Sequence, residues 1–148
     1  MAYLGTRIKQ LSNAYECKAN HMLQRHGLTA AQAEILRLVM LSRAQGESLN
    51  QKDIETALRL KNPTVTGTLN RLEAKGLIRR ESDPRDGRCK LIRPTDKALA
   101  AYEEVGQAFR LWEQRLLTGV GAQQQEQLLE LLDQVLENIQ EIREEKDE

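Results

Sequence analysis

Residues 62–80 read NPTVTGTLNRLEAKGLIRR, and this stretch decides the fold of the 148-residue chain. Asn62 followed by Pro63 predicts a helix start, because an N-cap residue precedes a proline whose missing amide costs nothing at the first helical position. Apolar residues follow at steps of three and four, and Gly76 stands where a left-handed C-cap is needed. The stretch therefore predicts a helix over 63–75. Its inward-facing residues are Val65, Leu69 and Leu72.

A shorter helix is predicted immediately before this one. Asn50 can cap a helix over 51–60, in which Ile54, Ala57 and Leu58 would be buried. A short helix, a tight turn and a second helix have the size of a helix-turn-helix, whose second helix enters the major groove of DNA by its N-terminus. The two segments together therefore predict a helix-turn-helix.

The outer face of the 63–75 helix carries small hydrogen-bonding groups that can approach base edges, together with one cation. The positive end of the helix dipole and the free amides of its first turn also favour a phosphate. Threonines on a helix can equally be solvated surface, so the flanking sequence has to decide between the two interpretations. The predicted DNA-binding residues of this segment are Asn62, Pro63, Thr64, Thr66, Gly67, Thr68, Asn70 and Arg71.

A basic hairpin is predicted directly after this helix, which favours the DNA-binding interpretation. Two short β-compatible runs, 77–81 and 89–93, flank a polar, turn-rich connection. Arg85 and Arg88 in that connection, with Lys90 just beyond, can reach a neighbouring minor groove, where negative potential attracts guanidinium groups. Helix and hairpin would then grip adjacent grooves.

Asp83 and Asp86 look unsuited to a DNA-facing loop, because carboxylates repel phosphate. A carboxylate can nevertheless hold a loop by accepting hydrogen bonds from its amides or from an arginine. We favour Asp86 as a brace for Arg88, with ordinary turn chemistry as the alternative.

Charge is distributed unevenly along the chain. Basic and acidic side chains balance to a net charge of zero, but residues 59–93 contain ten basic and four acidic side chains and carry +6. The remainder therefore carries −6, much of it in residues 137–148. A polyanion would therefore bind to the basic segment in the middle of the chain.

Residues 64–80, followed by DPRDGR at 83–88, resemble the signature of the MarR/SlyA family, and LTAAQ at 28–32 resembles the opening of that family's second helix. The resemblance spans nearly the whole chain and is densest over 28–95. It implies a mainly α (α+β) winged helix-turn-helix fold and an obligate homodimer. Such a dimer binds a pseudo-palindromic site on double-stranded DNA, commonly as a repressor released by a small aromatic or phenolic effector.

Two glycines depart from the family's pattern of DNA contacts. Some relatives carry a base-reading arginine at the position of Gly67 and a second wing arginine at the position of Gly87. Base specificity should therefore differ, and Arg85 or Arg71 would supply the missing charge. The residues that match the family's contacts are Pro63, Thr64, Gly67, Thr68 and Arg88.

Capping residues and glycines also mark where the other predicted helices begin and end. Thr29 and Gln32 form a predicted capping box, and Thr95 can cap a long helix that follows the hairpin. Gly119 and Gly121 break that long helix before a last one begins.

The first and last predicted helices carry more apolar surface than a small domain needs. We infer that they form an interface between two copies of the chain, with an intramolecular bundle as the alternative. The predicted organisation is one domain over 1–148, with a winged helix-turn-helix over 28–95 and dimerisation helices over 1–27 and 96–148. The stripes are Leu4, Ile8, Leu11, Tyr15, Ala19 and Met22, and Leu128, Leu132, Val135, Ile139 and Ile142.

The resemblance further implies a ligand cavity where the first, second and fifth helices meet. Each candidate lining residue is also a natural core residue, because aromatic and methionine side chains at helical spacing mostly pack. His21 and Arg25 could bind a carboxylate, or could simply be solvated. The candidate lining residues are Tyr15, Met22, Met40 and Trp112.

Two alternative functions stay open from the sequence. One branch of the family senses peroxide through a cysteine in the first helix, where this chain has Cys17, although no resolving partner is evident and a lone cysteine often only packs. The other alternative is a winged-helix protein-interaction module whose basic hairpin docks on an acidic partner.

Catalytic, metal and cofactor sites are not predicted. Cys17 and Cys89 form no CxxC pair, and His21 and His26 are the only histidines, so neither a zinc site nor a nucleophile with its base can be assembled. No run of eighteen apolar residues is present, and the first residues lack the pattern of a secretory signal. We therefore expect a cytoplasmic, non-enzymatic protein with no membrane partner.

Overall fold

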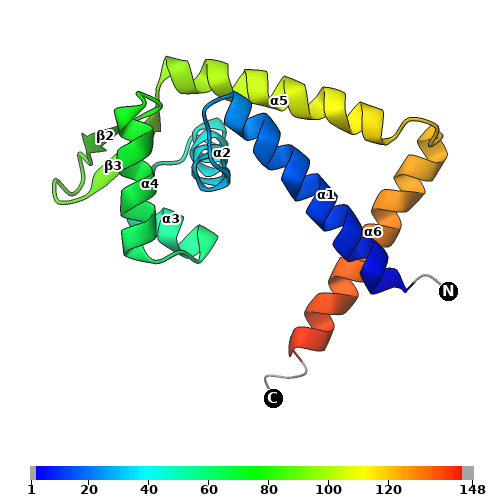
Figure 1. Ribbon diagram of the computed structural model, residues 1–148. Coiled ribbons are helices and arrows are strands. Elements are labelled where there is room, and N and C mark those ends of the chain that lie inside the picture. Colours follow the sequence, from blue (N-terminus) through cyan, green and yellow to red (C-terminus); the bar gives the residue numbers. More distant parts are fainter. Residues whose placement is uncertain (1–2, 145–148) are drawn as a thin grey trace. The chain divides into compact units, whose positions relative to one another are not determined.

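The computed structural model describes residues 3–144 and confirms a mainly helical α+β fold (Figure 1). Two compact units are present, one ending at Phe109 and the other beginning at Arg110, so that their boundary lies within α5. Among the described residues, no helix has an apolar stretch long enough to span a membrane. The elements are α1 (Leu4–Arg25), α2 (Ala30–Ala44), β1 (Leu49–Asn50), α3 (Gln51–Leu58), α4 (Asn62–Ala74), β2 (Ile78–Ser82), β3 (Lys90–Pro94), α5 (Asp96–Leu116) and α6 (Ala122–Glu144).

Side-chain caps start α2, α3 and α5 where the sequence predicts them. Thr29 and Gln32 form the expected capping box of α2, with both bonds at 3.2 Å. Asn50 caps α3, and Asp53 completes a second capping box by accepting from the Asn50 amide at 2.8 Å. Thr95 accepts from the amide of Ala98 at 3.2 Å, which caps α5. Each cap satisfies amides that the first turn of a helix leaves unpaired.

The end of α3 differs from the prediction. The helix stops at Leu58 and not at residue 60, because Arg59 has a left-handed backbone with φ of 52°. Ile54 is fully buried as predicted, but Ala57 is exposed and Leu58 only half-buried. The early stop leaves residues 59–61 as the turn between α3 and α4.

The start of α4 corrects the role predicted for Asn62. Asn62 is the first helical residue, and the N-cap residue is Lys61, which makes no side-chain cap bond. Pro63 still lies in the first turn, where a missing amide costs nothing. The predicted end of the helix is confirmed, since Gly76 follows α4 with φ of +70°.

The hairpin is confirmed, and it belongs to a three-stranded antiparallel sheet in the order β1-β3-β2. In the hairpin, Ile78 pairs with Pro94 and Ser82 pairs with Lys90. The remaining strand, β1, consists of Leu49 and Asn50 only, and its Leu49 pairs with Ile92. Two residues are too few to show strand periodicity in a sequence.

Burial of the inner face of α4 organises the first unit. Val65, Leu69 and Leu72 are all 0% exposed, as the sequence predicts. They join a cluster drawn from α1, α2, α3, the sheet and the start of α5, so the opposite face of α4 is turned toward solvent. The other most deeply buried members of the cluster are Ile35, Leu36, Val39, Ile54, Ile78 and Ala98.

The second unit consists of the C-terminal part of α5, from Arg110 on, and the helix α6. The two helices are separated at Gly119, which has φ of +83°, and at Gly121, whose amide donates to Gln124 at 3.0 Å. Large apolar side chains are exposed in the single chain, both here and on α1. On α1 they are Leu4, Ile8, Leu11 and Tyr15, and on α6 they are Leu128, Leu129, Leu131, Leu132, Leu136 and Ile139.

Two glycines of the α4 segment offer a matched test of this local structure. A Cβ added at Gly67 or at Gly76 meets no atom within 4 Å, so the backbone conformation alone separates the two sites. Gly67→Ala should stabilise the fold by about 0.5–1 kcal/mol, because alanine favours a helix interior. Gly76→Ala should destabilise it by roughly 1–2 kcal/mol, because its φ is positive.

Urea denaturation of the two variants and the parent measures both effects. Equal free energies of unfolding for Gly67→Ala and Gly76→Ala would contradict the assigned end of α4.

Candidate nucleic-acid interface

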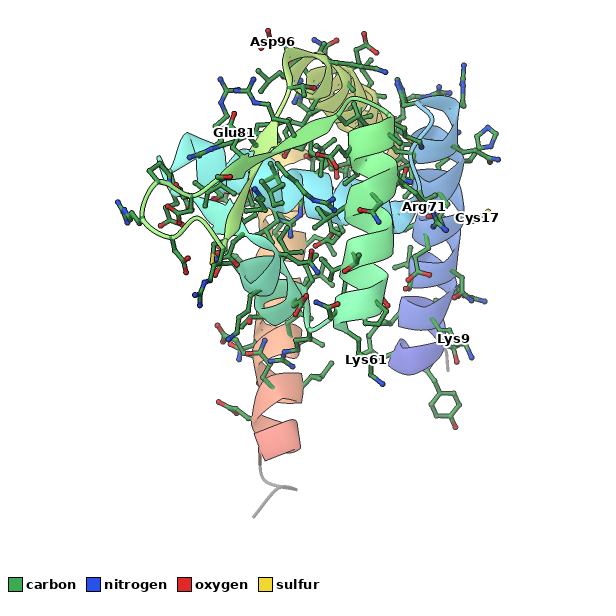
Figure 2. The ribbon with its side chains drawn as sticks, turned by 90° about the vertical axis from the view of Figure 1, so that its left-hand side faces the viewer. Lys9, Cys17, Lys61, Arg71, Glu81 and Asp96 are labelled. Carbon is green, nitrogen blue, oxygen red and sulfur yellow. The ribbon has the colours of Figure 1, made fainter. Side chains whose placement is uncertain are left out.

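The outer face of α4 carries most of the residues that the sequence singled out. Thr64, Asn70 and Arg71 are exposed, and Thr66 and Gly67 are half-buried. Figure 2 shows Lys61 at the N-terminal end of α4 and Arg71 further along the same helix. The helix thus presents a strip of polar groups with a cation at each end of it.

Thr68 is a correction to the predicted set. Its side chain belongs to the inner face, with only 7% of the residue exposed. The hydroxyl donates to the backbone carbonyl of Thr64 at 2.9 Å, a bond within the helix. Because Thr68 is buried and internally bonded, it cannot offer its hydroxyl to a groove.

A closed ring of hydrogen bonds joins α3 to the start of α4. The Gln51 amide nitrogen donates to the Thr66 hydroxyl at 2.8 Å and to the Glu55 carboxylate at 3.0 Å. The Asn62 amide nitrogen donates to the same Glu55 oxygen at 2.7 Å, and the Thr66 hydroxyl donates to the Asn62 amide oxygen at 3.3 Å. Gln51 and Glu55 were not among the predicted site residues, and their four-residue spacing in a helix was the one available signal.

Arg80 fastens the hairpin to the middle of α4. Its guanidinium donates to the Asn70 amide oxygen at 2.8 Å and pairs with Glu73 at 3.1 Å. The side chain is only 24% exposed, so this pair is better shielded from solvent than a typical surface ion pair. The contact sets where the hairpin stands relative to the outer face of α4.

A basic cavity of about 400 Å³ lies between α3, α4 and the hairpin. It brings the predicted residues Thr66, Arg88 and Lys90 together with Lys52 and Arg80, which the sequence analysis did not select. The lining contains four cations and no carboxylate, an arrangement that attracts a polyanion. The lining residues are Asn50, Gln51, Lys52, Thr66, Arg80, Arg88, Cys89, Lys90 and Ile92.

The hairpin tip is held by carboxylates that accept from the main chain. Asp83 accepts from the amide of Arg85 at 2.8 Å, and Asp86 accepts from the amide of Arg88 at 3.0 Å. The brace predicted for Asp86 therefore acts on the backbone of Arg88, by ordinary turn chemistry. Both arginine side chains are exposed at the tip.

Cys89 lies at the base of the tip, and its thiol donates to the Asp86 carboxylate at 3.6 Å. The negative charge of Asp86 is the main cause that raises the pKa of Cys89 above its ordinary value. A raised pKa keeps the thiol protonated and unreactive. Cys17 is exposed on α1 (Figure 2).

The four candidate ligand-lining residues fall in both units. Met22 and Met40 are buried in the first unit, at 9% and 8% exposure, and Tyr15 is exposed there. Trp112 is half-buried in the second unit. Their role in a ligand cavity stays a prediction. Among the side chains of residues 3–141, no group of three or more His, Cys, Asp and Glu is placed to hold a metal ion.

Comparison with known proteins gives a consistent result. A sequence model of the MarR family matches residues 26–88. The uncharacterised HTH-type transcriptional regulator YdgJ of Bacillus subtilis (strain 168) is 26% identical over 116 residues, which cover 78% of this chain and 68% of YdgJ.

Solved structures of MepR, a transcription regulator of the Staphylococcus aureus multidrug efflux pump MepA, are also similar. MepR superposes with a TM-score of 0.80 at 28% identity, covering 93% of this chain and 99% of MepR. MepR in complex with DNA gives a TM-score of 0.71 and covers 93% of this chain and 96% of that one. MepR bound to ethidium bromide gives 0.67 and covers 93% and 97%.

The Cys89 environment leads to a reactivity prediction. In a Cys17→Ser background, Asp86→Asn should increase the rate at which Cys89 is alkylated at pH 8, because loss of the charge lowers the pKa and raises the thiolate fraction. Asparagine retains an oxygen that can accept from the Arg88 amide. Asp83→Asn is the control and should change the rate less, since Asp83 contributes less to the raised pKa. A larger effect from Asp83→Asn would contradict this assignment.

Proposed function

We propose that this chain is a helix-turn-helix transcriptional regulator of the MarR type and that it binds double-stranded DNA in a sequence-specific manner. The observation that carries the proposal is the exposed polar face of α4 beside a cavity with four cations and no carboxylate. In the proposed complex, α4 enters the major groove and the hairpin enters the adjacent minor groove. The similarity to the DNA complex of MepR supports this arrangement.

We assign the contacts by chemistry and exposure. Thr64, Asn70 and Arg71 face base edges or the nearest phosphate, and Gly67 allows the backbone to approach closely. Arg85 and Arg88 enter the minor groove. The remaining contacts are to phosphate, from Lys52 and Lys90 in the cavity and from Asn62 and Pro63 at the positive end of the α4 dipole.

We further propose that the chain acts as a homodimer. The exposed apolar side chains of α1 and α6 form more apolar surface than a monomer usually leaves in water. Pairing of the segments 1–27 and 96–148 with a second copy would cover these apolar side chains. It would also relate the two winged helix-turn-helix regions, residues 28–95 of each copy, by a twofold axis. The two half-sites should then lie about one helical turn of DNA apart.

A response to a small aromatic ligand is part of the same proposal. The structure of MepR bound to ethidium bromide supports it by similarity. Within the first unit we assign the ligand contacts to Tyr15, Met22 and Met40, and we expect a repressor that leaves DNA when the ligand binds.

The salt dependence of binding tests the DNA proposal. Binding to a duplex taken from upstream of the gene should weaken steeply as salt increases, because cations on the protein displace counterions from phosphates. Arg88→Ala should lower both the affinity and the slope of log K against log salt, the slope by roughly 0.9 for the loss of one cation that displaces counterions from the DNA. Fluorescence anisotropy at four salt concentrations gives both values.

Arg37→Ala is the matched control, since Arg37 is an exposed arginine on α2 paired with Glu34 at 2.8 Å. It should leave the slope unchanged. DNA affinity that does not vary with salt, or equal effects of the two variants, would favour the protein-interaction module.

Sedimentation tests the homodimer. Leu132→Glu should convert the dimer to a monomer at micromolar concentration, because it places a charge among the exposed apolar side chains of α6. Gln134→Glu adds the same charge to another face of α6 and should leave the dimer intact. A parent protein that sediments as a monomer would remove the pairing proposal.

A further inference from the structure

The ring that joins Gln51, Thr66, Asn62 and Glu55 decides which hydrogen-bonding groups α4 can present. Thr66 has one hydroxyl proton, and that proton is directed to the Asn62 amide oxygen. One lone pair of the hydroxyl oxygen accepts from Gln51. Since a hydroxyl has one donor and two acceptor positions, Thr66 retains a lone pair and its methyl group, and it has no donor left.

Thr66 is nevertheless in position to meet DNA if α4 enters a groove. It is half-buried and lines the basic cavity together with Gln51. A threonine with a free hydroxyl can donate to a base or accept from one, so it discriminates little. A threonine without a donor is selective, because guanine shows only acceptors, N7 and O6, along its part of the major-groove edge.

We propose that Gln51 and Glu55 of α3 are positioning residues that set the base preference of α4 by withdrawing the donor of Thr66. The contacted base is then one that offers an N–H donor, adenine or cytosine, or the methyl group of thymine, and guanine is rejected at that position. This inference rests on the proposed DNA binding and deepens it by naming a determinant of specificity outside α4.

Glu55 is the anchor of the ring, because one carboxylate oxygen accepts from both Gln51 and Asn62. Its negative charge also lies beside a surface meant for phosphates, where it weakens binding to every sequence. The charge and the acceptor therefore have separable consequences. Glu55→Gln removes the charge and keeps an acceptor oxygen, whereas Glu55→Ala removes both.

The experiment begins by recovering preferred duplexes from a random-sequence pool with the full-length protein. Relative affinities for all four base pairs at each position are then measured by competition for the parent, Glu55→Ala, Glu55→Gln and Thr66→Val. Thr66→Val marks the contacted position as the one whose preference flattens. At that position the parent should bind guanine roughly tenfold more weakly than its preferred base, the size expected for one unsatisfied hydrogen-bonding group.

Both Glu55 variants should bind random DNA more tightly than the parent does, because each removes the charge. Only Glu55→Ala should tolerate guanine, with discrimination reduced to about twofold, because Asn62 loses the acceptor that fixes its amide and no longer holds the Thr66 proton. Glu55→Gln should retain the preference of the parent. This difference separates positioning from general electrostatics and from loss of structure, which thermal unfolding of each variant monitors.

Asn62→Ala provides a second route if Glu55→Ala does not fold. It removes the acceptor of the Thr66 proton from an exposed position and should likewise allow guanine. The inference is overturned if the parent prefers guanine at the marked position, if Thr66→Val flattens no position, or if Glu55→Gln and Glu55→Ala change the preference equally. Failure to recover any preferred duplex overturns the proposed function itself, and this inference with it.

Discussion

Burial of three residues on one side of α4 is the constraint on which the rest of the candidate DNA-binding surface depends. Val65, Leu69 and Leu72 are 0% exposed, and each contributes about 1.5–3 kcal/mol by leaving water. Because a helix repeats every 3.6 residues, fixing this side also fixes the direction of the polar side. The groups that could touch DNA are therefore oriented by the hydrophobic core beneath them.

Polar contacts then hold the two ends of α4 and the hairpin beside it. The ring with Gln51 and Glu55 holds the N-terminal end, and the Lys75 ammonium donates to the Gly27 carbonyl and to Gln32 at the C-terminal end. Arg80 ties β2 to the middle of the helix. A recognition helix fixed at three points loses little conformational freedom on binding, which preserves the free energy of its contacts for recognition.

Local features of the chain were predictable because their signals lie within a few residues of each other. The Thr29 capping box, the Gly76 helix end and the hairpin follow from such signals. The errors concern partners that are distant in sequence. Asn62 was predicted to cap its own helix, but its side chain bonds Glu55 of the preceding helix. Thr68 was predicted on the outer face, but the packing of α4 against the core buries it.

Net charge and hydrogen-bond direction determine different properties of DNA binding. The net charge of +6 over residues 59–93 indicates a polyanionic partner, but cations raise the affinity for every DNA sequence alike. Specificity requires hydrogen-bonding groups whose donors and acceptors are fixed before contact. Such groups are created here by neutral and acidic side chains, including a carboxylate that opposes general binding. The charge distribution therefore locates the DNA-binding region, and the directions of the hydrogen bonds within that region determine which DNA sequence it can bind.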